Sequence, residues 1–179
     1  MNFIKILDTT LRDGEQTSGV SFLPHEKLIV AKALVSDLNI PAIEVASARV
    51  SAGEQEAVAM ICRWASQAGV LDRVSCLGFV DGSSSVDWLS EAGCRKMNLL
   101  AKGSKKHCEG QLGKSAAQHI SDIKETLSLA SAKGIATSLY LEDWSNGMKD
   151  SPEYVFQLME ALIQTNIKRY MLPDTLGIL

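Results

Sequence analysis

The chain has 179 residues, of which 46% are apolar and 22% charged, with a formal net charge of −3. This length and balance are typical of one globular domain with a sizeable core. The local basic cluster KGSKKH at 102–107 is too short for a nucleic-acid footprint and is followed by Glu109. No apolar stretch approaches the roughly 18 residues of a membrane span. We therefore expect neither a nucleic-acid nor a membrane partner.

The N-terminus and the cysteines indicate a cytoplasmic protein. MNFIKILDTTLRDGEQ turns acidic within eight residues, which favours a first strand over a signal peptide. Cys62, Cys76, Cys94 and Cys108 form no C-x-x-C pair and have no metal-type spacing. We expect them to be reduced core residues rather than disulfides or zinc ligands.

Short β-rich runs alternate with amphipathic helical segments along the chain. The six predicted strands cover residues 3–7, 42–46, 74–79, 96–100, 136–141 and 167–172, with five helical segments between them. Three of these segments begin at N-terminal signals, which read SAGE at 51–54, SAAQ at 115–118 and SPE at 151–153. Strict alternation at about 30 residues per unit predicts a parallel sheet with helical crossovers.

Two architectures fit this alternation, a doubly wound open sheet and a TIM (β/α)8-type barrel. No G-x-G-x-x-G follows the first strand, and polar residues recur near strand ends, at Asp8, Glu44, Glu142 and Asp174. This distribution favours the barrel, with the strand order 1-2-3-4-5-6. Because such a barrel needs eight strands and about 250 residues, residues 1–179 are either a six-stranded portion of a longer barrel protein or a complete open sheet. The exposed edges of such a portion favour association.

The first predicted strand runs into DTTLRDGEQ at 8–16, which is densely charged. Asp13 offers a hard oxygen ligand for a divalent cation, and Arg12 offers a planar fork of donors. Placed together, a cation and a guanidinium suit the stabilisation of negative charge that develops on a substrate oxygen. The alternatives are a solvated turn or a structural ion pair.

Several separated motifs resemble one family. DTTLRDGEQTSGVSF, IEVASARVS, YLEDWSNG and LPDTLG resemble the acetyl-CoA-condensing branch of the DRE-TIM metallolyase superfamily, with its citramalate, 2-isopropylmalate and homocitrate synthases. The resemblance extends from residue 3 to residue 179, and it implies that residues 1–179 are the N-terminal six-strand portion of the barrel, without strands seven and eight or the C-terminal region. It also implies a cytoplasmic barrel acyltransferase of leucine or isoleucine biosynthesis that forms homo-oligomers, with a dimer as the expected form. Such an enzyme binds Mg²⁺, Mn²⁺ or Zn²⁺ and condenses acetyl-CoA with a 2-oxo acid.

The resemblance also implies roles for individual residues. Arg12 matches the arginine that stabilises the developing oxyanion, and Asp13 matches a carboxylate ligand of the metal. Glu44 matches the glutamate of the family's Asp, Arg, Glu pattern and is expected to orient Arg12. Glu142 matches a glutamate with a proton-transfer role, and Thr175 matches the threonine whose hydroxyl binds the carboxylate of the acceptor.

Further residues match less specifically, and one family feature is missing. We expect Gln16 to be a polar contact at the mouth and His107 to lie on the loop after strand four, where relatives also have a histidine. His25 and His119 lie in helical patterns and are expected to be structural. The family's two remaining metal ligands form an H-x-H pair on strand seven, and this sequence contains no H-x-H. We therefore expect the 179-residue chain to be inactive alone.

The acceptor pocket can be predicted in outline. Alternating residues of a strand share a face, so Tyr140 and Glu142 are expected to point the same way. Isopropylmalate synthases often have a small serine where this sequence has Tyr140, so less room remains for the acceptor's alkyl group. With Leu77 and Leu100 at the ends of strands three and four, pyruvate is favoured over 2-oxoisovalerate, although a methylene changes binding by only about 1–3 kcal/mol. Leu77 and Leu100 could equally be plain core.

Two other functional classes remain open. A lyase of the hydroxymethylglutaryl-CoA type shares the Arg, Asp and Glu chemistry but breaks the carbon bond, and YLED is the reason to prefer condensation. A non-catalytic truncated paralogue that associates with full-length subunits is the other alternative. An H-x-H in a continuing reading frame would distinguish a catalytic chain from this paralogue.

Overall fold

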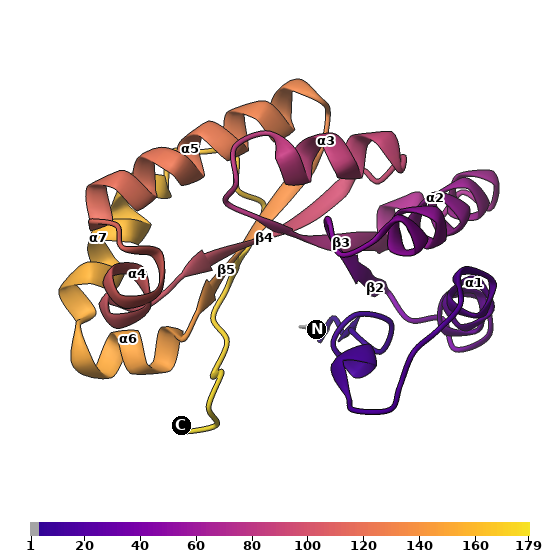
Figure 1. Cartoon of the computed structure of the whole chain (residues 1–179), viewed down its shortest axis with the longest axis horizontal. Coiled ribbons are helices and arrows are strands. Elements are labelled where there is room, and N and C mark those ends of the chain that lie inside the picture. The colour runs from indigo at the N-terminus through magenta and orange to yellow at the C-terminus, as the bar shows by residue number, and fades with distance from the viewer. Residues whose placement is uncertain (1–3) are drawn as a thin grey trace. The chain divides into compact units, whose positions relative to one another are not determined.

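The structure, shown in Figure 1, is a computed structural model that describes residues 4–179. These residues contain six strands. They are Leu7–Asp8 (β1), Ala42–Ser47 (β2), Val74–Phe79 (β3), Lys96–Lys102 (β4), Ala136–Glu142 (β5) and Tyr170–Met171 (β6). Their order in the sheet is β1-β2-β3-β4-β5-β6, and β1 with β2, β2 with β3 and β5 with β6 pair in parallel. The predicted α/β class and sequential strand order are confirmed, and the doubly wound order is excluded because it reverses at a switch point.

The strands differ from their predicted bounds mainly at the two ends of the sheet. β1 begins at Leu7 rather than residue 3, which lies outside the described residues, and β6 covers only two of the six predicted residues. Both are terminal strands of the described sheet, where only one neighbouring strand supplies hydrogen bonds. β4 and β5 instead extend beyond their predicted ends, to Lys102 and Glu142.

The described residues form seven α-helices where five helical segments were expected. They are Pro24–Lys32 (α1), Ala52–Gln67 (α2), Ser84–Glu91 (α3), Lys105–Leu112 (α4), Ala116–Ala132 (α5), Trp144–Asp150 (α6) and Pro152–Leu162 (α7). The connections after β4 and β5 each contain two helices. Gly113 ends α4 in the left-handed region, at φ 63°, and Pro152 begins α7 because its fixed φ suits a first helical position.

The predicted helix starts are confirmed in position, but their capping contacts differ. Ser115 forms the full capping box with Gln118 at the start of α5. Ser51 Oγ accepts the N–H of Glu54 at 3.1 Å, whereas the Glu54 carboxylate pairs with Lys27 rather than returning to Ser51. The attraction of a buried ammonium is stronger than that of a backbone N–H, which explains the difference.

The chain divides into two compact units. The first contains the described residues up to Leu77 together with Asp87–Met97, and the second contains Gly78–Val86 and Asn98–Leu179. In the first unit α1 packs on α2 and both contact β2. In the second unit α7 packs on α5 and α6, and α5 contacts β5. Each unit therefore has its own layer of helices against its strands.

Burial alternates along β5 and along the last four residues of β4. In β5, Thr137, Leu139 and Leu141 are buried, whereas Tyr140 and Glu142 are half-buried. Successive strand residues point to opposite faces, so Tyr140 and Glu142 share one face, as expected. Leu100 and Lys102 of β4 share a half-buried face in the same way.

The predicted burial of the four cysteines is confirmed. All four cysteines are buried free thiols. Within residues 4–179, every helix is too short or too polar to cross a membrane. The cytoplasmic location stays a prediction.

Candidate active site

The turn after β1 places the first group of predicted site residues. The carbonyl oxygen of Thr9 accepts the N–H groups of Arg12 and Asp13 at 3.0 and 2.8 Å. Asp8 Oδ1 accepts the N–H of Thr10 at 3.0 Å, which fixes the entry to the turn. Asp8 and the two threonines thus shape the backbone, and the turn presents Arg12 and Asp13.

Arg12 lies between two carboxylates of the first unit. Its Nε donates to Glu44 Oε2 at 2.6 Å, and its Nη1 donates to Asp13 Oδ1 at 2.7 Å. The Glu44 side chain is 0% exposed, whereas that of Asp13 is 60% exposed. Glu44 on β2 therefore holds the guanidinium from the buried side, and Asp13 meets it from the solvent side.

A cavity of about 470 Å³ adjoins this group within the first unit. Arg12 and Gln16 line it from the turn after β1, and Ser47 lines it from the end of β2. The side chain predicted as a polar contact, Gln16, thus lies at the same cavity as Arg12. A guanidinium at a cavity wall can bind an anionic or carbonyl oxygen of a small molecule.

The residues described here do not complete a metal centre. Asp13 offers a solvent-exposed carboxylate, which is a suitable oxygen ligand for a divalent cation. Among residues 4–179, however, no three His, Cys, Asp or Glu side chains are grouped so that they could hold a metal ion. Asp13 is therefore at most one ligand of such an ion.

The second unit holds Glu142 at the end of β5. Its Oε2 forms an ion pair with Lys102 Nζ at the end of β4. The backbone N–H of Lys102 donates to His119 Nε2 at 3.0 Å, and Gly103 N donates to the carbonyl oxygen of Glu142 at 2.6 Å. Lys102 was missed by sequence reasoning, because β4 was expected to end two residues earlier and the lysine was counted only as part of a basic cluster.

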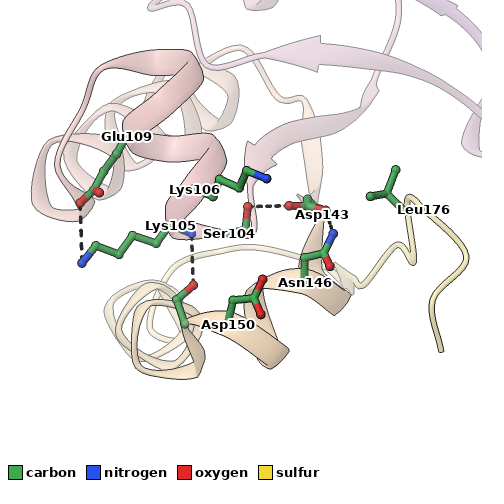
Figure 2. Close-up of a pocket in the computed structure, with 9 residues that line it drawn as sticks. Ser104, Lys105, Lys106, Glu109, Asp143, Asn146, Asp150 and Leu176 are labelled. Atoms are coloured by element: carbon green, nitrogen blue, oxygen red, sulfur yellow. Dashed lines mark hydrogen bonds and ion pairs between the residues drawn. The ribbon is translucent and has the colours of Figure 1, made fainter.

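Asp143 follows Glu142 and is the centre of a second network. Ser104 Oγ and Asn146 Nδ2 donate to its carboxylate, each at 2.7 Å (Figure 2). His107 Nε2 lies 3.5 Å from Oδ2. Its backbone N–H donates to Thr175 Oγ1 at 3.0 Å. Asp143 also has φ 63°, a left-handed conformation that is rare for a residue other than glycine. Backbone strain of this kind is concentrated at functional sites.

The network changes the proton affinity of Asp143. Burial opposes ionisation of its carboxyl group, but the hydrogen bonds from Ser104 and Asn146, assisted by the charges of His107 and Lys106, outweigh it. The pKa of Asp143 is therefore below its ordinary value, and the group is a carboxylate at neutral pH.

Asp143 and Ser104 line a cavity of about 500 Å³ in the second unit. Figure 2 shows Lys105 and Lys106 on one side of it and Asp150 with Asn146 on another. The cavity wall thus carries both signs of charge. Such a wall suits a polar ligand with several oxygen and nitrogen atoms.

The predicted site residues fall into two groups. The first unit contains Arg12, Asp13, Gln16, Glu44 and Leu77, and the second contains Leu100, His107, Tyr140, Glu142 and Thr175. Direct bonds join Arg12 to Asp13 and Glu44. His107 and Thr175 both contact Asp143, which sequence reasoning did not select although it follows Glu142 in YLED.

The two other histidines have different surroundings. His119 is buried in α5 and accepts a backbone N–H, and burial, with the charge of Lys114, lowers its pKa to about 4. It is therefore neutral and supports the end of β4. His25 is exposed on α1.

Known proteins resemble the chain along nearly its whole length. A family profile described as HMGL-like matches residues 3–179. A putative (R)-citramalate synthase of Methanopyrus kandleri is 30% identical over 98% of this chain and 33% of its own length. A probable 2-isopropylmalate synthase of Ignicoccus hospitalis is 29% identical over 98% of this chain and 42% of its own length. The chain thus spans about a third to two fifths of these relatives.

Solved structures show the same fold. The hydroxymethylglutaryl-CoA lyase of Pseudomonas aeruginosa aligns with a TM-score of 0.77 and 18% identity, over 98% of this chain and 59% of the lyase. The HMG-CoA lyase of Brucella melitensis aligns with a TM-score of 0.76 and 23% identity, over all of this chain and 64% of that one. At such identities the likeness concerns the fold alone.

Proposed function

This chain belongs to the HMGL-like family, and from this premise we propose that it is the N-terminal part of the catalytic barrel of an alkylmalate synthase. The proposed reaction is the condensation of acetyl-CoA with a short 2-oxo acid, with pyruvate as the favoured acceptor and citramalate as the product. The observation that carries the proposal is the Arg12 guanidinium held at 2.6 Å by buried Glu44, with exposed Asp13 beside it.

Arg12 is suited to stabilise an oxyanion. Its guanidinium has five N–H groups, and two of them are used by Glu44 and Asp13. The others can donate to the oxygen of a 2-oxo acid that becomes negative when its carbonyl carbon is attacked. Because Glu44 fixes the guanidinium beforehand, little reorganisation is needed during the reaction.

Asp13 is proposed as one ligand of the divalent cation, Mg²⁺, Mn²⁺ or Zn²⁺, that the resemblance implies. Its exposed carboxylate supports this role. The remaining ligands would come from outside residues 1–179, since the sequence has no H-x-H pair. We accordingly propose that the chain alone does not turn over acetyl-CoA.

Glu142 is proposed as the proton-transfer group for the acetyl thioester. Its half-buried carboxylate lies on the same face of β5 as Tyr140, and Lys102 neutralises its charge. Thr175 is proposed to bind the carboxylate of the acceptor, and His107 and Gln16 are proposed as further contacts with substrate. Leu77, Leu100 and Tyr140 are proposed to bound the acceptor's alkyl group, and the bulk of Tyr140 favours pyruvate.

A 2-isopropylmalate synthase is the second candidate. The 2-isopropylmalate synthase of Ignicoccus hospitalis is 29% identical to this chain, and the citramalate synthase of Methanopyrus kandleri is 30% identical, so sequence identity favours neither candidate. The difference between the two activities is the size of the acceptor, and Tyr140 is the residue on which we base the choice. A lyase reaction and a non-catalytic role of a truncated paralogue are the remaining alternatives.

The test measures the release of CoA thiol from acetyl-CoA. The 179-residue chain alone is expected to release none, and the same chain fused to the C-terminal part of the Methanopyrus kandleri relative is expected to release CoA with pyruvate. Tyr140→Ser in this fusion should raise the rate with 2-oxoisovalerate relative to pyruvate by roughly tenfold. If the ratio of the two rates is the same before and after the substitution, Tyr140 does not select the acceptor. Turnover of acetyl-CoA by the 179-residue chain alone would contradict the proposal that this chain lacks part of the active site.

The expected homodimer is also a proposal. Light scattering on the fused chain would check it, with twice the monomer mass as the expected result. A monomeric fusion that is active would contradict it.

A further inference from the structure

Lys27 of α1 has no part in the proposed chemistry, yet its side chain is completely buried in the first unit. Its Nζ lies 2.5 Å from Glu15 Oε2 and 2.6 Å from Glu54 Oε1. It also donates to the carbonyl oxygen of Leu11 at 3.1 Å and, at the long limit of 3.5 Å, to that of Val45. A buried ammonium is tolerated only when it is paired and hydrogen-bonded in this way.

The two carbonyl groups belong to neighbours of the proposed catalytic pair. Leu11 directly precedes Arg12, and Val45 directly follows Glu44. The Lys27 ammonium therefore contacts the backbone at both members of the pair. One contact is next to Arg12 in the turn after β1, and the other is next to Glu44 within β2. A longer separation of these two backbones would break the 2.6 Å bond between Arg12 and Glu44.

The two carboxylates extend the contact to other segments. Glu15 belongs to the same turn as Arg12, and its Oε1 accepts the N–H of Phe22 at 2.8 Å. Glu54 belongs to the first turn of α2, where Ser51 caps the helix. From its place on α1, Lys27 thus contacts three other segments, which are the turn after β1, strand β2 and the start of α2. A neutral side chain of similar volume could fill this space but could not make these bonds.

We propose that Lys27 is the positioning residue of the Arg12–Glu44 pair. Its ammonium fixes the turn after β1 against β2 so that the guanidinium meets the buried carboxylate. The consequence for catalysis rests on the proposed function. The effect on the geometry of Arg12 does not, and it can be measured in the 179-residue chain without turnover.

The experiment separates positioning from simple stabilisation. Lys27→Met removes the ammonium but leaves Glu15 and Glu54 as uncompensated carboxylates, so it weakens both the fold and the position of Arg12. The triple variant K27M/E15Q/E54Q removes all three charges and keeps similar volumes, which restores stability but not the bonds to Leu11 and Val45. Val58→Ala, at a buried position of α2, is the control for plain destabilisation.

The readout is the Nε–Hε resonance of Arg12 in a nitrogen–proton NMR spectrum, assigned by its loss in Arg12→Lys. In the unaltered chain this proton donates to Glu44 and should exchange slowly with water. We expect the triple variant to unfold at a urea concentration near that of the unaltered chain but to exchange this proton roughly tenfold faster. Val58→Ala should unfold at lower urea with the exchange unchanged.

The contact itself is tested in the unaltered chain. A correlation through the hydrogen bond, from Lys27 Nζ to the carbonyl carbon of Leu11, is expected, and its absence would overturn the proposal. Unaltered exchange of the Arg12 proton in the triple variant would overturn it as well, and so would failure of that variant to fold. Failure of the fused enzyme to release CoA would instead contradict the proposed function and leave these NMR results standing.

Discussion

The two units stabilise their buried carboxylates by different means. In the first unit Glu44 is fully buried and receives a hydrogen bond from a cation, the guanidinium of Arg12. In the second unit Asp143 is also buried, but its closest donors are the neutral groups of Ser104 and Asn146. The first arrangement depends on charge balance, and the second depends on the geometry of several weaker donors. The two units should therefore respond to different changes.

The largest effect is expected from removal of the cation in the first unit. Arg12→Met leaves the carboxylate of Glu44 buried without its guanidinium, which should lower the free energy of unfolding by about 3–5 kcal/mol. Urea unfolding of the 179-residue chain measures this change. In the fused chain, CoA release should fall roughly 100- to 1000-fold, the cost of losing an oxyanion donor.

Arg12→Lys is the matched control, because it keeps the positive charge and loses the planar fork. It should recover much of the stability and little of the activity. Recovery of full activity by lysine would show that charge alone suffices at this position.

Acid should weaken the second unit through His119. Its pKa is about 4 in the folded chain, against an ordinary value of 6.5, so the unfolded chain binds more protons between these two values. The titration of His119 therefore leaves the free energy of unfolding unchanged above about pH 6.5. As the pH decreases towards 4, it lowers the free energy of unfolding by up to about 3 kcal/mol. Urea unfolding at a series of pH values measures this slope.

His119→Gln removes the titration and keeps an acceptor for the N–H of Lys102. In this variant the stability should be nearly independent of pH between 6.5 and 4. The lowered pKa of Asp143 adds a loss of stability only at more acidic pH, below the ordinary value of 3.8. An unchanged slope in His119→Gln would assign the acid sensitivity to another group.

A smaller effect on stability is expected at Glu142. Because its ion pair with Lys102 is partly exposed, Glu142→Gln should change the free energy of unfolding by only about 0–1 kcal/mol. CoA release by the fused chain should nevertheless fall by roughly 100-fold or more, since the glutamine cannot transfer a proton. A large loss of stability with retained CoA release would show that Glu142 supports the fold and does not transfer the proton.

The smallest effect is expected on the surface of the cavity in the second unit. Lys105 and Glu109 face each other one helical turn apart at 3.9 Å, and both are more than half exposed. Lys105→Ala should change stability by less than about 0.5 kcal/mol in urea unfolding. A larger change would show that the charged wall of this cavity supports the fold.

Much of the fold could be predicted because local signals and the global arrangement agree. The four inner strands were located to within two residues at each end, since their apolar runs form buried strands. β1 and β6 could not be bounded in this way, because the pairing that lengthens a strand depends on its neighbours. The extra helix after β4 was missed because Gly113, which ends α4, lies in a polar stretch without apolar periodicity.

The candidate site was predictable where it carries a motif, and elsewhere it was not. Arg12, Asp13 and Glu44 stand in recognisable patterns, and the structure joins them by direct bonds. Lys27 belongs to an ordinary helical pattern, in which lysine is expected to face solvent. Its burial follows from oxygen atoms contributed by the turn after β1, β2 and α2, and no local pattern contains that information.

The burial of Lys27 also affects how the chain meets amine-reactive reagents. An acylating reagent needs a solvent-accessible, uncharged amine, and this ammonium is enclosed by oxygen atoms. Lys105, which is more than half exposed, would be labelled readily under the same conditions. The rate at which Lys27 becomes acylated therefore reports how often local unfolding of the first unit exposes this side chain.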